Sequence, residues 1–145
     1  MQFTTTLAVL VGAIASTAMA GNAIVENKCT STIYLTITRA NQMSSTRPIA
    51  PGQKYQEAIA NQGNSFGITR NADYYSPNTP KLIWGFSNAP PTLYYSVSQV
   101  NGDPFAGAKF RLRSSDGNCG AVTGYDGRTR TCGSNNDFTL VACAK

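Results

Sequence analysis

The sequence of 145 residues contains no histidine. A serine or cysteine nucleophile activated by a histidine base is therefore excluded, and so is any metal site that needs an imidazole ligand. Glutamate is also scarce, since only Glu26 and Glu57 occur. No segment after residue 20 keeps its apolar residues at the 3.6-residue period of a helix. These absences narrow the possible enzyme classes and argue against a helical bundle.

The N-terminal segment, residues 1–20, is predicted to be a cleavable signal peptide. Its apolar run, Leu7–Ala15, is too short to span a bilayer as a helix. The run is followed by Ala18-Met19-Ala20, which fits the small-x-small pattern that signal peptidase accepts. Cleavage would leave residues 21–145 as a single domain of a secreted, extracellular or wall-associated protein. No transmembrane segment is expected in that domain.

Four cysteines fall in the expected mature domain: Cys29, Cys119, Cys132 and Cys143. An even number in an exported chain implies two disulfides, with three possible connectivities. Spacing favours Cys119–Cys132 as a local staple, and Cys29–Cys143 would then tie the two chain ends together. No pair has the CxxC spacing of a zinc site, so we expect no metal and no cofactor.

Short segments that alternate apolar and polar residues, separated by turn residues, predict an all-β domain. Ile33–Thr38 and Phe138–Cys143 alternate most regularly, and Pro51-Gly52 fits the centre of a type II turn. Many short strands joined by Gly/Pro turns favour a sandwich or a barrel. Further strands are predicted over Ala23–Asn27, Lys54–Ile59, Ser65–Arg70, Leu82–Phe86, Leu93–Val100 and Ala108–Arg113.

Several stretches resemble thaumatin-like proteins. AIVENKCTSTIYLTIT is similar to the family's opening, and RPIAPGQKYQEAI continues the match through its Pro-Gly turn. The VNGDPFAG motif at Val100–Gly107 is similar to that of a small fungal branch, the CetA-like or blastomyces yeast-phase-specific family. The resemblance implies a small thaumatin-like β-sandwich stapled by two disulfides. Joining the first and last cysteines is also this family's habit.

Larger thaumatin-like proteins carry a cleft of one arginine and several carboxylates, linked in some members to β-1,3-glucan binding or weak hydrolysis. The resemblance places the cleft arginine at Arg70. Uncharged residues stand where it implies carboxylates: Gly85, Ser96 and Asn101. Asp73 and Asp103 are the nearest acidic residues left, and they are the pair a weak glucanase would use. Asp103 precedes Pro104 and has an ordinary explanation as a turn residue.

Basic residues form a second candidate site. Lys109, Arg111 and Arg113 share one face of a predicted strand, and Arg128 and Arg130 repeat the spacing near Cys132. Together they would form a basic patch for an anionic glycan or lipid head group, in keeping with the net charge of +5. A charged outer face that deters edge pairing is the more ordinary interpretation. The basic residues lack interleaved aromatics, so no nucleic acid partner is expected.

Tyrosines form a third candidate site, because aromatic rings stack on the apolar faces of sugars. Tyr74 and Tyr75 lie in a polar loop and are the favoured sugar contacts, although packed loop tyrosines are equally expected. Trp84 lies between Leu82 and Phe86 at strand spacing and is assigned to the core.

The resemblance implies a secreted, non-enzymatic fungal protein that acts at the cell wall or a host surface. It would bind wall β-glucan or act as an effector or elicitor of host responses, and we expect a monomer. A weak endo-β-1,3-glucanase is the first alternative, and a membrane-directed antimicrobial protein is the second. The residues expected to contact the ligand are Arg70, Asp73, Tyr74, Tyr75 and Asp103.

Overall fold

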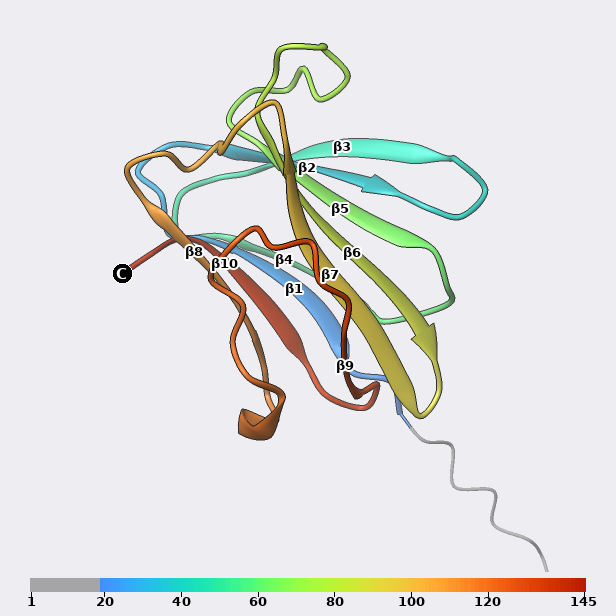
Figure 1. Ribbon diagram of the computed structural model, residues 1–145. Coiled ribbons are helices and arrows are strands. Elements are labelled where there is room, and N and C mark those ends of the chain that lie inside the picture. Colours follow the sequence, from blue (N-terminus) through green and yellow to red (C-terminus); the bar gives the residue numbers. More distant parts are fainter. Residues whose placement is uncertain (1–18) are drawn as a thin grey trace, which may run out of the picture.

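The computed structural model describes residues 19–145, which form two β-sheets packed face to face (Figure 1). The one helical element in this range is a short 3₁₀ helix, η1 (Gly117–Cys119). The expected all-β sandwich is therefore confirmed. Residues 1–18 of the expected signal peptide lie outside the described residues.

The smaller sheet has four strands in the order β4-β1-β10-β8. At its centre β1 (Asn22–Asn27) runs parallel to β10 (Phe138–Ala144), so both ends of the domain meet in one sheet. At its two edges β4 (Lys54–Ala58) and β8 (Lys109–Ser114) pair antiparallel with these strands.

The larger sheet has six antiparallel strands in the order β3-β2-β5-β6-β7-β9. These strands are β2 (Ile33–Thr38), β3 (Ser44–Ile49), β5 (Asn64–Thr69), β6 (Lys81–Ala89), β7 (Thr92–Val100) and β9 (Arg130–Gly133). The two edge strands, β3 and β9, are not predicted by the sequence pattern. β2 has the expected bounds, and each of the other strands begins and ends within three residues of them.

The core is built from the apolar residues on the inner faces of both sheets. Trp84 on β6 is completely buried, and its ring packs edge-to-face on Phe66 with ring centroids 5.4 Å apart. Burying one large apolar side chain stabilises the fold by about 1.5–3 kcal/mol. The prediction that Trp84 belongs to the core rather than to a sugar site is confirmed.

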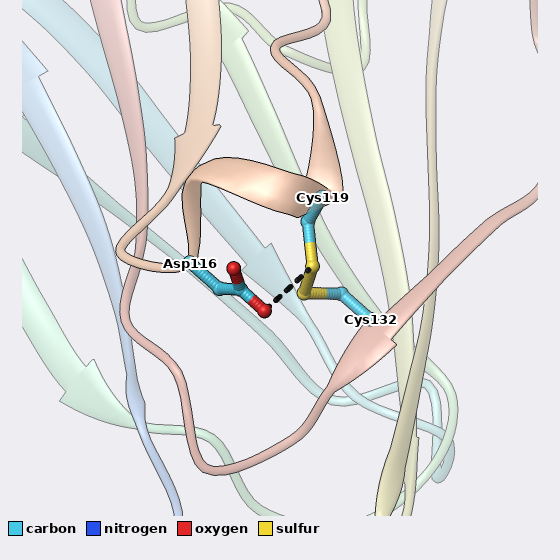
Figure 2. A group of neighbouring side chains, drawn as sticks. All are labelled: Asp116, Cys119 and Cys132. Carbon is cyan, nitrogen blue, oxygen red and sulfur yellow. Dashed lines mark hydrogen bonds between the residues drawn. A yellow bond between two sulfur atoms is a disulfide. The ribbon is translucent and has the colours of Figure 1, made fainter.

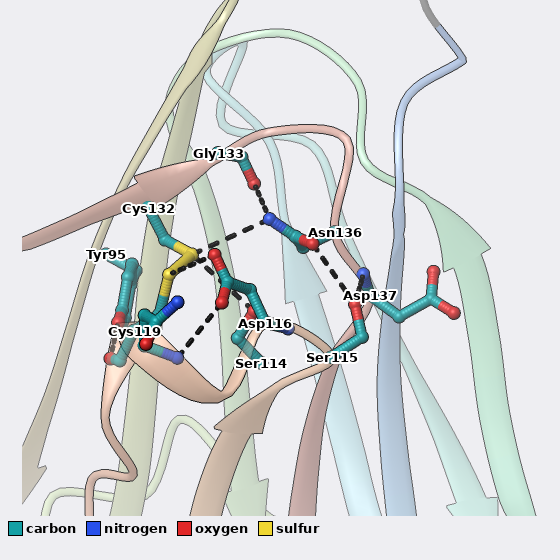
Figure 3. The surroundings of a disulfide bond; sticks show 10 residues. Tyr95, Ser114, Ser115, Asp116, Cys119, Cys132, Gly133, Asn136 and Asp137 are labelled. Atoms are coloured by element: carbon teal, nitrogen blue, oxygen red, sulfur yellow. Dashed lines mark hydrogen bonds between the residues drawn. A yellow bond between two sulfur atoms is a disulfide. The ribbon is translucent and has the colours of Figure 1, made fainter.

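Both predicted disulfides are present. Cys29 and Cys143 join the loop after β1 to the end of β10, with Cα atoms 5.0 Å apart. Cys119 and Cys132 join η1 to β9, with Cα atoms 5.7 Å apart. The Tyr95 hydroxyl donates a hydrogen bond of 3.2 Å to the Cys119 carbonyl oxygen in the surroundings shown in Figure 3. The second disulfide therefore connects the segment after β8, at the edge of the smaller sheet, to β9, at the edge of the larger sheet.

One polar cluster links the two sheets at the opposite edge. Arg39, which follows β2, donates hydrogen bonds of 2.7 and 2.6 Å to the two carboxylate oxygens of Glu57 on β4. The Tyr55 hydroxyl donates to the same carboxylate at 2.6 Å. Burial alone would raise the pKa of Glu57, but the hydrogen bonds from Arg39 and Tyr55 together lower it below the ordinary value.

Candidate binding faces

A row of small, uncharged residues crosses the outer face of the six-stranded sheet. Its members are direct cross-strand neighbours on five adjacent strands: Ser44, Thr38, Ser65, Gly85 and Ser96. The residues beside them along the strands, such as Phe66 and Tyr95, are buried, so alternation turns this row outward. Neighbouring strands lie about 4.8 Å apart, so the row is about 19 Å long. We call it the hydroxyl row.

Two exposed tyrosines flank the hydroxyl row. Tyr75 is 68% exposed, and its hydroxyl donates a hydrogen bond of 2.6 Å to the Ser44 side chain at one end. Tyr94 is 45% exposed and lies on β7, two residues from Ser96 at the other end. A hollow of about 260 Å³ lies beside Tyr94, and its walls include Gly85 and Ser96. The row and its tyrosines therefore form an uncharged platform with an aromatic ring near each end.

The neighbouring residue Tyr74 has a different role, because it anchors its loop to the sheet. It is half-buried, and burial raises the pKa of its hydroxyl. The ammonium of the buried Lys81 lies 4.7 Å from its ring centroid and donates to its carbonyl oxygen. Its ring meets that of Tyr75 edge-to-face, with centroids 5.0 Å apart. Of the two tyrosines predicted to contact sugar, only Tyr75 is exposed.

Arg70 and Asp103 both hold the segment that follows β7. The Arg70 Nε donates to the Pro104 carbonyl oxygen at 2.9 Å, and its guanidinium lies 5.1 Å from the Phe105 ring centroid. The Asp103 Oδ1 accepts from the Phe105 backbone N–H at 2.7 Å and from the Tyr125 hydroxyl at 2.5 Å. Burial, followed by the hydrogen bond to Asp103, raises the pKa of Tyr125. These contacts give both residues a structural role in positioning the turn.

Asp73 is exposed in the loop between β5 and β6. Its backbone N–H donates to the Asn71 side chain at 3.1 Å, as in an Asx turn. Within residues 19–145, no hydrogen bond or ion pair joins Asp73 to Arg70 or to Asp103.

The basic residues divide between the two sheets. Lys109, Arg111 and Arg113 lie exposed on β8, as the alternation predicts. Arg130 instead belongs to β9 in the other sheet, and the Asp126 carboxylate accepts bonds of 3.0 and 2.7 Å from its guanidinium. Arg128 precedes this strand and its backbone N–H donates to the same carboxylate. Arg128 and Arg130 therefore do not share the strand face of Lys109, Arg111 and Arg113, because β9 pairs with β7 in the other sheet. That all five residues form one basic patch stays a prediction.

Within the part of the chain that the structure describes, one group has ligand atoms as close together as a metal site would require: Asp116, Cys119 and Cys132 (Figure 2). The two sulfurs are bonded to each other in the disulfide, so neither offers a thiolate. One oxygen of Asp116 accepts a hydrogen bond of 3.0 Å from the Asn118 backbone N–H at the start of η1. The group therefore serves the local structure of the disulfide loop.

The architecture, with two packed sheets and the chain ends joined by a disulfide, is that of a thaumatin-like protein. The family model of the Blastomyces yeast-phase-specific protein, Bys1, matches residues 10–144, and the chain belongs to this family. Comparison with curated proteins gives no match.

Two of the solved structures that share the fold are an elicitor and an enzyme inhibitor. The protein elicitor MoHrip2 from Magnaporthe oryzae is 21% identical, with a TM-score of 0.70 over 86% of this chain and 100% of that one. The thaumatin-like xylanase inhibitor TLXI is 11% identical, with a TM-score of 0.62 over 84% of this chain and 99% of that one. Among the described residues, no helix is long and apolar enough to cross a membrane.

Proposed function

We propose that the protein is a secreted, non-enzymatic protein of the cell wall or host surface that binds neutral β-glucan on the hydroxyl row. The observation that carries the proposal is the uncharged row between two exposed tyrosines. An elicitor and an enzyme inhibitor share the fold, which supports a role based on recognition rather than catalysis.

The chemistry of the row suits a neutral sugar chain. Serine and threonine hydroxyls both donate and accept hydrogen bonds, as sugar hydroxyls do. The rings of Tyr75 and Tyr94 offer apolar faces for stacking while their hydroxyls remain hydrated. A platform about 19 Å long accommodates a few consecutive sugar rings. The same exposed face would be available for a host receptor if the protein acts as an elicitor.

The carboxylates that glycoside hydrolysis would need are either replaced by uncharged residues or hydrogen-bonded within the fold. Retaining and inverting glycosidases place two carboxyl groups about 5 Å or about 6.5–9.5 Å apart around the scissile bond. The hydroxyl row carries Gly85 and Ser96 where the larger relatives are expected to carry such groups. Asp103 already accepts two hydrogen bonds from its own fold. We therefore favour binding without turnover.

Export would follow cleavage after Ala20. Met19 and Ala20 are exposed, whereas Gly21 is buried and its backbone N–H donates to the Ser134 carbonyl oxygen at 3.0 Å. The part of the chain that is buried and hydrogen-bonded within the domain thus begins at Gly21, the residue after the expected cleavage site. Mass measurement of the secreted protein is expected to give Gly21 as its first residue, and a retained leader would refute this step.

A pull-down on insoluble β-1,3-glucan tests the proposed function. Tyr75→Ala combined with Tyr94→Ala is expected to abolish retention, because both stacking rings are removed. Val100→Ala removes a similarly exposed apolar side chain from the far end of β7 and is the control, with retention unchanged. Retention of the double variant at the wild-type level would overturn the proposal. Release of reducing ends from soluble glucan by the wild-type protein would favour the glucanase alternative.

A further inference from the structure

The outer face of the four-stranded sheet presents unpaired positive charge along one edge. On β8, Phe110 and Leu112 point into the core, whereas Lys109, Arg111 and Arg113 are exposed. Within residues 19–145, the side chains of these three residues form no hydrogen bond and no ion pair. Their charges are therefore free to meet an external partner. We call these three residues the basic strip.

The surface beside the basic strip is hollowed and carries further cations. Arg111 and Arg113 border a hollow of about 490 Å³, which Lys28 and Lys145 also line. The acidic side chain in its lining, Glu26, already forms an ion pair of 2.8 Å with Lys28. A second hollow, of about 420 Å³, adjoins it and is lined by Lys109, Arg111 and Lys145 among others. The local field along this edge is therefore positive.

The spacing within the basic strip suits a chain of repeated negative charges. Alternate residues of a strand lie about 6.7 Å apart, so the three cations extend over about 13 Å. The two arginines carry planar guanidinium groups that bind carboxylates through paired hydrogen bonds. A linear polymer with a carboxylate on its sugar rings would meet these groups in succession.

The same face lacks the features that a membrane or a nucleic acid would use. Peripheral membrane proteins insert apolar side chains below the head groups. The large exposed apolar side chains of the described residues are Met19, Met43, Tyr75, Tyr94 and Val100, and none lies on β1, β4, β8 or β10. The face therefore has no exposed aromatic ring for stacking on nucleic acid bases either.

We propose that the basic strip docks a carboxylated polysaccharide, a polymer that contains uronic acid units. The hydroxyl row and the basic strip lie on the outer faces of opposite sheets, which point away from each other (Figure 1). One molecule can therefore hold a neutral and an acidic polysaccharide at the same time.

Affinity electrophoresis through a gel that contains polygalacturonate tests this proposal. Arg111→Ser combined with Arg113→Ser is expected to weaken retardation about tenfold or more, because two charge-assisted contacts are lost. The matched control, Arg47→Ser combined with Arg128→Ser, removes the same charge from exposed positions elsewhere and is expected to change retardation less than about twofold. Equal losses in the two double variants would show attraction by net charge alone and would overturn the proposal.

Four further measurements complete the test. Arg111→Lys with Arg113→Lys retains the charge, and partial retardation is expected because the planar fork is lost. Salt raised from 0.1 M to 1 M shortens the Debye length from about 10 Å to about 3 Å and should release the wild-type protein. Retention on neutral β-1,3-glucan should not change in the serine variant, so this test is separate from that of the hydroxyl row. Wild-type protein that binds phosphatidylserine vesicles but not polygalacturonate would assign the strip to a membrane instead.

Discussion

A methyl group in place of the Gly67 hydrogen would lie 2.1 Å from the Cε2 atom of Tyr74. The aromatic ring therefore rests directly on the backbone of β5, and the loop between β5 and β6 is held to the outer face of the sheet at this point. The position of Tyr75 depends on this contact, because its backbone follows that of Tyr74.

We expect Gly67→Ala to destabilise the fold by about 1–3 kcal/mol, since the new methyl group displaces a packed ring. Gly85→Ala is the matched control on the next strand, where the nearest atom, the Ser96 Oγ, is 3.6 Å from the added carbon. Urea denaturation of both variants measures the difference. Equal midpoints for the two variants would show that the ring does not depend on Gly67.

The Arg39–Glu57 pair should make stability depend on pH. The folded-state pKa of Glu57 is lower than its ordinary value of 4.5, so its stabilising contribution is complete above pH 4.5 and is lost as the pH falls below it. Glu57→Gln is expected to cost about 1–2 kcal/mol at pH 7 and to flatten the acid side of the stability curve. Urea midpoints measured between pH 3 and pH 7 test this.

Glu26→Gln provides the control for that experiment. Its partner Lys28 is exposed, and exposed pairs contribute about 0–1 kcal/mol. If the urea midpoint of Glu57→Gln falls with decreasing pH as steeply as that of the wild-type protein, other carboxylates are responsible for the pH dependence.

The two disulfides should differ in their contribution to stability. In the chain-entropy model a loop of about 15 residues contributes about 3 kcal/mol and one of about 100 residues contributes about 4.7 kcal/mol. The separations here are 13 residues for Cys119–Cys132 and 114 for Cys29–Cys143. Replacing the terminal pair by alanines should therefore cost more than replacing the local pair in guanidinium denaturation. The reverse order would show that local contacts around η1 outweigh chain entropy.

The sequence pattern predicts the fold well where strands are half-buried. Ile33–Thr38 has the predicted bounds, because its alternation reflects one buried and one outer face. β3 (Ser44–Ile49) is missed because five of its six residues are exposed, so no alternation marks it. It also contains Pro48, which an edge strand tolerates. β9 (Arg130–Gly133) is an edge strand too and is very short.

The candidate site is harder to predict from the sequence than the strands are, because it depends on strand register. Ser44 and Ser96 are far apart in the chain and become parts of one row only through four separate pairings. From the sequence alone, Gly85 and Ser96 are therefore recognised only as uncharged residues at positions where carboxylates are expected. Likewise, no local pattern reveals that Asp103 accepts a hydrogen bond from Tyr125.

Whether β-glucan lies on the hydroxyl row is best tested by the affinity of Gly85→Val for soluble β-1,3-glucan oligosaccharides, measured by titration calorimetry. The added side chain stands in the hydroxyl row between Ser65 and Ser96. The nearest atom to its first carbon is the Ser96 Oγ at 3.6 Å, an ordinary contact, and a β-branched residue suits a strand. Binding by the wild-type protein, and its loss in Gly85→Val with an unchanged thermal midpoint, is the predicted result. A Gly85→Val protein that binds the oligosaccharides as tightly as the wild type would show that the sugar chain does not lie on this row.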